Sequence, residues 1–427
     1  MVTKYKMKNT EIGLLPEDWD VKSLSEIGVF SKGFGITRDQ AQSGNIPCIR
    51  YGEIYTTHHN YIRRFCSYIS QEIANTSTKL KTGDILFAGS GETKEEIGKA
   101  VAFVGREDAY AGGDIIILSP KINVSSLFLG FVLNNESSVK QKSSLGQGDA
   151  VVHIHAKELA GVLVPFPNHD EQHAIASVLS EMDTMILRLE QAIAKKKLMK
   201  DGAMQQLLTG RIRLNNSTNE WIQVTFGDVI SRFATGLNPR QNFTLNSGGS
   251  CNYVTIKDFK DGVLNFENCD KINQEACELI NRRSDLRVGD LLFSSIGRVG
   301  DAYVIKEEAT DWNINESVYN LRPRHDLITS DFLYYIIKSH EVYQKLQDAV
   351  TGSTLRSIKM NHLKAISFTI PPTIEEQLEI ATILSAMDNE IQSLEAEKNK
   401  YLSIKQGMMQ KLLTGQIRLP QSCLKEE

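Results

Sequence analysis

Histidines occur in two close pairs, His58-His59 and His153-Ile154-His155, whose ring nitrogens could bind a metal ion. Neither pair has a third ligand at a suitable spacing, so we interpret these side chains as ordinary histidines. The six cysteines form no CxxC pair and no Cys/His cluster of zinc spacing, so we expect buried or idle thiols rather than a metal site or a disulfide framework. The cysteines are Cys48, Cys66, Cys251, Cys269, Cys277 and Cys423.

A glycine-rich turn, FAGSGE (Phe87–Glu92), follows a strand-like run and resembles the first motif of S-adenosylmethionine-dependent methyltransferases. No amphipathic helix follows this turn, and the NPPY-type tetrapeptide of DNA amino-methyltransferases is absent. The overlapping GETKEEIGK lacks the GxxxxGK[ST] spacing of a P-loop. The acidic PEDWDVK loosely resembles a nuclease site, but its counterpart later in the chain, TNEWIQV, lacks these acids. None of these motifs assembles a nucleophile with a base.

Composition is that of an ordinary globular protein, with 41% hydrophobic and 23% charged residues in 427 positions. This length predicts two to four domains. No run reaches the roughly 18 apolar residues of a membrane helix, and the first 20 residues lack the apolar core of a signal peptide. We therefore expect a cytoplasmic protein. The net charge of −4 gives no general indication of nucleic-acid binding.

The chain repeats itself after 205 residues: LLTGRIRL (Leu207–Leu214) returns as LLTGQIRL (Leu412–Leu419), and EQHAIASVLSEMD as EQLEIATILSAMD. The likeness is weaker further upstream, where GDILF is matched by GDLLF. Each half therefore consists of about 150 variable residues followed by about 45 nearly invariant ones. We infer that the invariant parts contact the same partner twice and that the variable parts contact two different targets.

The invariant parts show the 4-3 apolar spacing of a coiled-coil seam, which continues toward Met199 and Ile404. A helix of about 38 residues would be about 57 Å long. Two unrelated amphipathic helices on separate cores would explain the spacing, but we favour antiparallel pairing with a pseudo-two-fold axis. The predicted seam residues are Ile175, Leu179, Met182, Ile186, Leu189 and Ile193 in the first copy and Ile380, Leu384, Met387, Ile391 and Leu394 in the second.

Other residues of the invariant parts also recur, although a coiled-coil seam does not require them. We expect them to form a docking surface that is presented twice, for two copies of one partner. The candidates are Glu171, Gln172, Leu207, Leu208 and Arg213, repeated as Glu376, Gln377, Leu412, Leu413 and Arg418.

The variable halves contain short β-type runs broken by Gly, Asn, Asp and Ser, together with helix-like stretches, which favours α+β domains. Equivalent loops of both halves carry side chains of the types that read base edges and hold phosphates, although any single one could be a solvated surface residue. The DNA-binding candidates are Lys32, Arg38, Arg50, Ser90, Lys94, Gln147 and His153 in the first half and Arg240, Gln241, Lys257, Ser294, Ser295, Arg298, Ser353, Thr354, Arg356 and Lys359 in the second.

With these motifs, the chain resembles the specificity subunit of type I restriction–modification enzymes over its whole length. The motifs that carry the resemblance are EQ-x-x-IA-x-x-LS-x-MD, LLTG-x-IRL, the GDILF/GDLLF strands and TGSTLRSI. It implies an α+β fold in which two globular target-recognition domains (1–165 and 215–370) are separated by two helical regions (166–214 and 371–427) that form an antiparallel coiled coil. The segment SLGQGDAVVHIHAK departs from the family's TGST pattern, which leaves the DNA contacts of the first half less defined.

The resemblance also implies a function. Each domain would read one half of a bipartite site in double-stranded DNA, and the helical regions would dock two modification (methyltransferase) subunits. Those subunits would bring S-adenosylmethionine, and a restriction (motor-nuclease) subunit would bring ATP and Mg. The resemblance further implies that this chain has no catalytic activity itself, and we expect no cofactor, metal or membrane contact in it. Two alternatives stay open: the specificity part of a fused restriction–methylation enzyme, and a scaffold with two binding modules that does not bind DNA.

Overall fold

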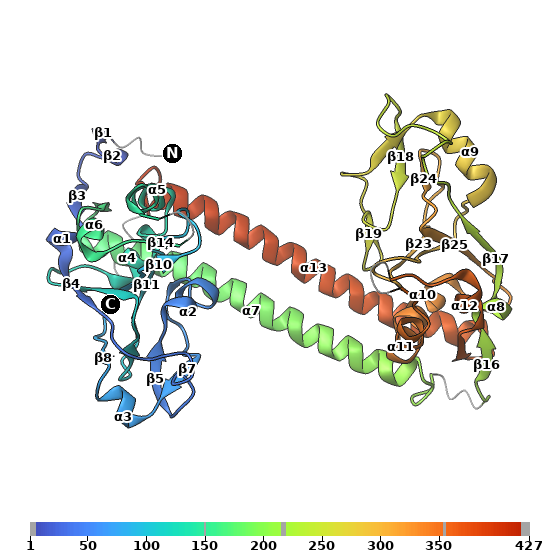
Figure 1. Cartoon of the computed structure of the whole chain (residues 1–427), viewed down its shortest axis with the longest axis horizontal. Helices are drawn as coiled ribbons and strands as arrows, with labels where there is room; N and C mark the ends of the chain where they lie inside the picture. Colours follow the sequence, from blue (N-terminus) through green and yellow to red (C-terminus); the bar gives the residue numbers. More distant parts are fainter. Residues whose placement is uncertain (1–5, 149–150, 215–218, 353–355, 420–427) are drawn as a thin grey trace. The chain divides into compact units, whose positions relative to one another are not determined.

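The computed structural model describes residues 6–148, 151–214, 219–352 and 356–419. The chain forms two compact units, which we call unit 1 (Met1–Glu190 with Ala396–Glu427) and unit 2 (Gln191–Glu395). Each unit contains one variable domain, part of the long helix α7 (His169–Leu207) and part of the long helix α13 (Ile374–Leu412), which Figure 1 labels. The boundaries between the units therefore fall inside both helices.

The main sheet of unit 1 has the strand order β4-β13-β9-β11-β6. Its central strands β9 (Ile85–Ala88) and β13 (Ile115–Pro120) are short apolar runs, as expected for strands covered on both faces. Ile85 and Phe87 belong to one hydrophobic core, and Leu86 and Ala88 belong to another. This alternation follows from the two-residue period of a strand. The remaining strands are β4 (Gly28–Lys32), β11 (Ala100–Ala102) and β6 (Asn60–Tyr61).

A second sheet of unit 1 has the order β7-β5-β12-β8, in which β5 is parallel to β12 and antiparallel to β7. Its strands are β7 (Ser67–Ile69), β5 (Ile46–Ile49), β12 (Tyr110–Ala111) and β8 (Thr78–Lys79). The other strands of unit 1 form three two-stranded pairs: β1 (Met7–Thr10) with β2 (Gly13–Pro16), β10 (Ser90–Gly91) with β14 (Val152–His153), and β3 (Asp20–Ser23) with β15 (Leu163–Phe166). The short helices are α1 (Leu24–Ile27), α2 (Tyr51–Thr56), α3 (Gln71–Ala74), α4 (Ser126–Val132), α5 (Glu136–Leu145) and α6 (Ala156–Ala160).

Unit 2 repeats this arrangement in the same chain order, which confirms the predicted α+β class and internal repeat. Its main sheet, β17-β25-β22-β23, consists of β17 (Ile230–Thr235), β25 (Val318–Pro323), β22 (Leu291–Ser294) and β23 (Ala302–Val304). Its second sheet, β21-β18-β24, consists of β21 (Asp270–Ile272), β18 (Cys251–Val254) and β24 (Trp312–Ile314). Two further pairs are β16 (Ile222–Thr225) with β26 (Ser367–Ile370) and β19 (Phe259–Lys260) with β20 (Val263–Leu264). The short helices are α8 (Phe226–Val229), α9 (Gln274–Ser284), α10 (Ser330–Lys338), α11 (His340–Asp348) and α12 (Met360–Ala365).

The two long helices run antiparallel within each unit, as predicted. In unit 2, Lys196 pairs with Glu390 (2.6 Å) and Lys200 with Asp388 (2.5 Å), so positions rise along α7 as they fall along α13. In unit 1, Glu171 pairs with Arg418 (2.6 Å) and Asp183 with Lys405 (2.5 Å), which gives the same antiparallel sense. Both helices contain 39 residues, close to the predicted length.

Most of the predicted seam residues are buried. Ile175, Leu179, Ile380 and Leu384 are at most 1% exposed and form part of the domain cores. The next group, also buried, consists of Ile186, Leu189, Ile193 and Ile391, whereas Met182, Met387 and Leu394 are half-buried.

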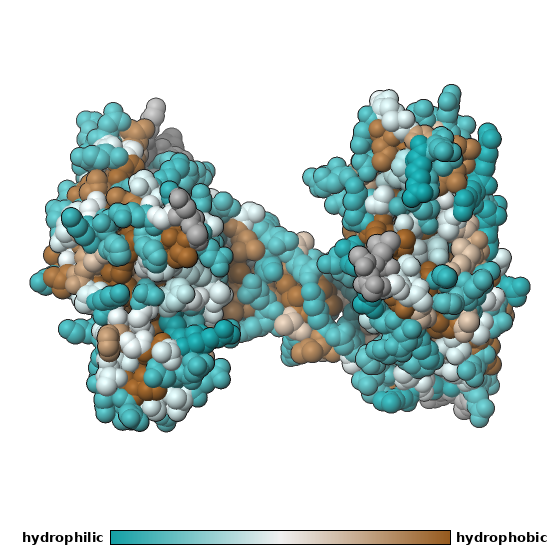
Figure 2. Space-filling view, viewed as in Figure 1, coloured by the Kyte–Doolittle hydropathy of each residue, from teal (hydrophilic) through white to brown (hydrophobic). Residues whose placement is uncertain are grey.

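The predicted continuation of the seam was wrong at two positions. Met199 is 48% exposed and Ile404 is 41% exposed. Figure 2 shows hydrophobic surface along the long helices.

The expectation for the cysteines was wrong at one pair. Cys251 of β18 and Cys277 of α9 form a disulfide with a Cα–Cα distance of 6.5 Å. Their separation of 26 residues in the sequence carries no signal, because the chain passes through β21 before α9 returns to β18. Cys48 and Cys269 are buried thiols, Cys66 is an exposed thiol, and Cys423 lies outside the described residues.

No helix in the described part of the chain combines the length and the apolar character that crossing a bilayer requires. No three His, Cys, Asp or Glu side chains within the described ranges are grouped so as to hold a metal ion.

Candidate nucleic-acid interface

In unit 1, the turn after β9 is joined to the segment before α6. β10 pairs with β14, so that Ser90 lies opposite His153 and its hydroxyl is 3.0 Å from His153 Nδ1. The Gln147 N–H also donates to the His153 carbonyl at 2.9 Å. Lys94, Gln147 and His153 are exposed, and Ser90 is half-buried. We call the surface formed by Ser90, Lys94, Gln147 and His153 turn face 1.

A buried lysine binds the backbone of the turn that carries Ser90 and Lys94. Lys142 of α5 is 1% exposed, and its Nζ donates to the Gly98 carbonyl at 2.6 Å. Burial lowers the pKa of Lys142 to about 7. Gly98 has φ +67°, and a side chain here would meet Lys142 Cδ at 3.2 Å, so this tight turn favours glycine.

Unit 2 joins the equivalent turn and segment in the same way. Ile358 N–H donates to the Ser295 carbonyl, and Gly297 N–H donates to the Arg356 carbonyl, both at 2.9 Å. Three of the predicted candidates, Arg298, Arg356 and Lys359, are exposed here. We call the surface that they form turn face 2.

A glutamine in unit 2 takes the place of Lys142. Gln347 lies 205 positions after Lys142 and donates its amide to the Val299 carbonyl at 3.1 Å. Its amide oxygen accepts a hydrogen bond from Arg356 Nη2 at 3.0 Å. Arg298 is held by Asp301 at 2.6 Å. The two turn faces therefore share a backbone arrangement but present different side chains.

Four of the predicted DNA-binding candidates in unit 2 are not placed as expected or cannot be described. Ser294 and Ser295 are buried, and their hydroxyls donate to the carbonyls of Ile296 and Ser317. Their hydroxyls stabilise the turn and are not available for a base or phosphate. Ser353 and Thr354 lie outside the described residues.

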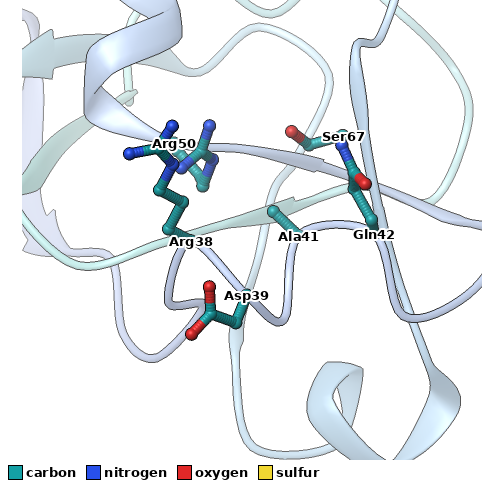
Figure 3. A pocket seen from close by; sticks show the side chains of 6 residues that line it. All are labelled: Arg38, Asp39, Ala41, Gln42, Arg50 and Ser67. Carbon is teal, nitrogen blue, oxygen red and sulfur yellow. The ribbon is translucent and has the colours of Figure 1, made fainter.

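The remaining candidates are not part of the turn faces. Lys32 is exposed and lies 3.9 Å from Asp114, and Lys257 lies 3.4 Å from Asp270. Arg240 and Gln241 are exposed in the loop between β17 and β18. Arg38 and Arg50 line a separate pocket of about 470 Å³ in unit 1 (Figure 3).

The predicted docking residues are mostly buried inside the units. In unit 1, Glu171 is 3% exposed and accepts a hydrogen bond from Trp19 Nε1 at 3.0 Å. The Arg418 guanidinium reaches the same carboxylate at 2.6 and 2.7 Å and also contacts Asp18. We call the interaction of Trp19, Glu171 and Arg418 clamp 1.

Unit 2 has the equivalent interaction, clamp 2. Glu376 is 4% exposed and is bound by Arg213 at 2.7 and 2.8 Å, while the Arg213 guanidinium lies 5.9 Å from the ring centre of Trp221. Each clamp ties the chain just beyond the end of one long helix to the beginning of the other.

The repeated glutamines hold loops in place. Gln172 donates to the Pro167 carbonyl and accepts from the Ser125 N–H, at 2.8 and 2.9 Å. Gln377 donates to the carbonyls of Pro371 and Leu327 and accepts from the Thr329 N–H. Both side chains are 0% exposed, so their partners replace the hydrogen bonds that water would make.

The expectation of an exposed docking surface at these positions was therefore wrong. Leu207 and Leu208 belong to the core of unit 2, and Leu412 and Leu413 belong to the core of unit 1. The letters recur because each unit needs the same internal contacts. Other repeated side chains in this region are exposed, namely Gln205 and Ile212 with their counterparts Gln410 and Ile417.

Sequence reasoning missed a pair of repeated aspartates. Asp183 contacts Lys405 at 2.5 Å and Arg63 at 3.0 Å, and Asp388 contacts Lys200 at 2.5 Å and the Tyr335 hydroxyl at 2.8 Å. Lys200 and Lys405 are equivalent under the repeat, as are the two aspartates. The retained opposite charges were a signal that could have revealed this contact.

A family model described as the type I restriction modification DNA specificity domain matches residues 16–197 and 218–403. The MjaVIII specificity subunit of a type I restriction enzyme from Methanocaldococcus jannaschii is 22% identical over 422 residues, which cover 95% of this chain and 94% of that protein.

Solved structures show the same fold. The S subunit of a type I restriction–modification system from M. genitalium matches with a TM-score of 0.61 and 15% identity, over 96% of this chain and 99% of that one. A chain from a structure describing complex assembly of the type I system matches with a TM-score of 0.54 and 17% identity, over 94% of this chain and 99% of that one. The duplicated family match covers most of both halves, and the chain therefore belongs to the family of type I restriction–modification DNA specificity subunits.

Proposed function

We propose that each unit reads one half of a bipartite site in double-stranded DNA. The observation that carries this proposal is the pair of turn faces, which share a backbone arrangement but carry different side chains. Turn face 1 presents Lys94, Gln147 and His153, whereas turn face 2 presents Arg298, Arg356 and Lys359. Such groups bind phosphates or base edges, and a different set in each unit suits two different half-sites.

Reciprocal substitutions test this assignment in the full chain with its partner subunits. Arg356→Ala is expected to weaken binding or relax base preference in one half-site only, by about 1–3 kcal/mol if the guanidinium reads a base. Lys94→Ala is its counterpart in unit 1 and is expected to affect the other half-site. Duplexes altered in one half at a time, compared by fluorescence anisotropy, separate the two effects. Equal losses on both halves from either variant would contradict separate readers.

The same proposal assigns the helical regions to two methyltransferase subunits. The residues that would contact them are the exposed members of the repeat, Gln205 and Ile212 in one copy and Gln410 and Ile417 in the other. Ile212 is 51% exposed and Ile417 is 45% exposed, although both are apolar. Two equivalent apolar side chains at the surface fit two copies of one partner.

Stoichiometry tests the docking proposal. Ile212→Glu and Ile417→Glu should each leave one methyltransferase subunit bound, and the double variant should leave none, as measured by native mass spectrometry. Full stoichiometry in the double variant would exclude this surface. A normal unfolding profile for each variant would show that the loss is one of docking.

Catalysis is assigned to the partners. The methyltransferase subunits would supply S-adenosylmethionine, the restriction subunits would supply ATP and Mg, and this chain would have no catalytic activity itself. Methylation of duplex DNA by the isolated chain would favour a fused enzyme. Failure of the assembled complex to bind any duplex would favour a scaffold that does not act on DNA.

A further inference from the structure

Unit 1 contains a polar pocket of about 470 Å³ that is separate from turn face 1. It lies between the loop after β4 and the adjacent ends of β5 and β7. In Figure 3 the guanidinium groups of Arg38 and Arg50 lie side by side, and Ser67 and Gln42 lie across the opening from them. The pocket is lined by Arg38, Asp39, Ala41, Gln42, Arg50 and Ser67.

Arg50 is held in place by a buried carboxylate. Its Nε donates to Glu53 Oε1 at 3.2 Å, and the Ser67 hydroxyl donates to the same oxygen. Glu53 is only 5% exposed. Although burial by itself raises the pKa of Glu53, hydrogen bonds from His58, Ser67 and Arg50 leave that pKa below its usual value, so the carboxylate is charged. One edge of Arg50 is therefore fixed, and its Nη groups have no hydrogen-bond partner among the described residues.

Arg38 adds a second cation that has no partner in the described part of the chain. Its side chain is exposed and makes neither a hydrogen bond nor an ion pair there. Asp39 also lines the pocket, but Figure 3 shows its carboxylate directed away from the two guanidinium groups. Two adjacent guanidinium groups repel each other, and an anion between them would relieve this repulsion.

The shape of the pocket favours a phosphate over a base edge. Phosphates protrude from a DNA duplex, whereas base edges are recessed in the grooves and are read by side chains that project into them. A concave site with guanidinium donors on its wall suits a group that enters from outside. Paired N–H groups of arginine match two phosphate oxygens.

Unit 2 lacks this arrangement at the equivalent position. The residue after β18 is Thr255, which lies 205 positions after Arg50. The backbone N–H of each donates to a carboxylate three residues later, Glu53 or Asp258. In unit 2 the Thr255 hydroxyl also binds Asp258, so a neutral group takes the place of the guanidinium.

We propose that the pocket lined by Arg38 and Arg50 binds a backbone phosphate of the DNA, which gives unit 1 a contact that unit 2 lacks. This inference rests on the proposed DNA-reading function. It assigns Arg38 and Arg50 to positioning of the duplex, while base preference in that half-site belongs to turn face 1.

The test measures the salt dependence of DNA binding by the assembled complex of full chain and methyltransferase partners. Arg38→Ala is the main variant, because the Arg38 side chain makes no hydrogen bond or ion pair among the described residues whose loss could unfold the unit. Arg106→Ala is the matched control, because Arg106 is also an exposed arginine. Arg106 precedes β12 whereas Arg50 follows the parallel strand β5, so the two residues lie toward different ends of the second sheet. Affinities for a target duplex and for duplexes with single base changes are compared between roughly 50 and 200 mM salt.

The proposal expects Arg38→Ala to weaken binding to all duplexes by the same factor. It also expects the slope of log K against log salt to become shallower by about 0.9, the value for one lost phosphate contact. Arg106→Ala should leave the slope unchanged. The phosphate site is overturned if Arg38→Ala lowers the affinity only for duplexes with one particular base, or if it leaves the slope of log K against log salt unchanged. In either case, normal binding of the target duplex by the unaltered complex leaves the proposed function intact. If the unaltered complex does not bind the target duplex, both fall.

Discussion

Clamp 1 predicts that one substitution lowers the stability of unit 1 and that a second substitution restores part of it. Arg418→Ala leaves the Glu171 carboxylate, which is 3% exposed, without its guanidinium partner. Removing one partner of a buried ion pair costs about 3–5 kcal/mol, because the other charge stays buried and uncompensated. Trp19 Nε1 would still donate to Glu171, which places the expected loss near the lower end of that range.

Adding Glu171→Gln to Arg418→Ala should restore part of the lost stability. The amide keeps an acceptor for Trp19 but carries no charge, so the double variant should be more stable than Arg418→Ala by about 1–3 kcal/mol. This recovery distinguishes a buried ion pair from simple packing, since a packing contact would lose further stability with each substitution.

Tryptophan fluorescence can follow unit 1 alone. The chain has three tryptophans, Trp19, Trp221 and Trp312, and only Trp19 belongs to unit 1. In a Trp221→Phe, Trp312→Phe background, urea unfolding should show a midpoint lowered by roughly 1–2 M for Arg418→Ala. Arg213→Ala breaks clamp 2 in unit 2 and serves as the matched control, which should leave the Trp19 transition unchanged.

Two results would refute this reasoning. The first is an Arg418→Ala midpoint that differs from the unaltered chain by less than about 0.3 M, which corresponds to less than about 1 kcal/mol. The second is a double variant that is less stable than Arg418→Ala alone. Either would mean that clamp 1 does not hold unit 1 together through its charges.

Three further predictions follow from buried groups. Lys142→Met should stabilise unit 1 at pH 7, and this gain in stability should shrink by about 1.4 kcal/mol per pH unit between pH 7 and pH 9. In that range the native lysine (pKa about 7) becomes neutral while the lysine of the unfolded chain stays protonated, so the unaltered protein gains stability as the pH rises. Urea unfolding at several pH values measures the difference, and a difference independent of pH contradicts the prediction. Leu207→Glu and Leu412→Glu should unfold unit 2 and unit 1 respectively, since each buries an unpaired charge; circular dichroism that matches the unaltered chain would count against the core positions. Tyr335→Phe should cost about 1 kcal/mol in unit 2 by removing the hydroxyl from Asp388, whereas Tyr334→Phe at the next position should cost less; similar costs in urea unfolding would mean that this hydrogen bond adds nothing.

The sequence alone indicated the repeat, the α+β class and the antiparallel helices. Each depends on a periodic feature of the sequence, either the 205-residue shift or the 4-3 spacing. Such features can be recognised without knowing what the side chains contact. Ile175, Leu179, Ile380 and Leu384 are accordingly buried, within the domain cores.

Other inferences failed because identical letters do not reveal what they contact. Glu171, Arg213, Glu376 and Arg418 are charged, and charged residues are usually exposed, so a docking surface was the natural interpretation. Their burial depends on contacts between residues more than 160 positions apart, which no local pattern reports. Met199 and Ile404 show the opposite error, since both are exposed although the residue after each, Lys200 or Lys405, contacts the other long helix.

The candidate DNA-binding residues also show the difference between what local sequence suggests and what only the tertiary contacts reveal. Loop position alone suggested Ser294 and Ser295, but their hydroxyls are used within the turn. The pairing that brings Ser90 to His153 joins parts of the chain 63 residues apart and needed the sheet to be known. The pocket of Arg38 and Arg50 likewise depends on the fixed position of Glu53.

The central claim is that two units read two different half-sites, and mapping of methylated adenines in the host genome tests it most directly. Cells carrying the unaltered chain should show one bipartite motif with a fixed gap. Cells carrying Arg356→Ala should show relaxation in one half of that motif, with the other half and the gap unchanged. A single continuous motif, or a change in both halves, would contradict the account.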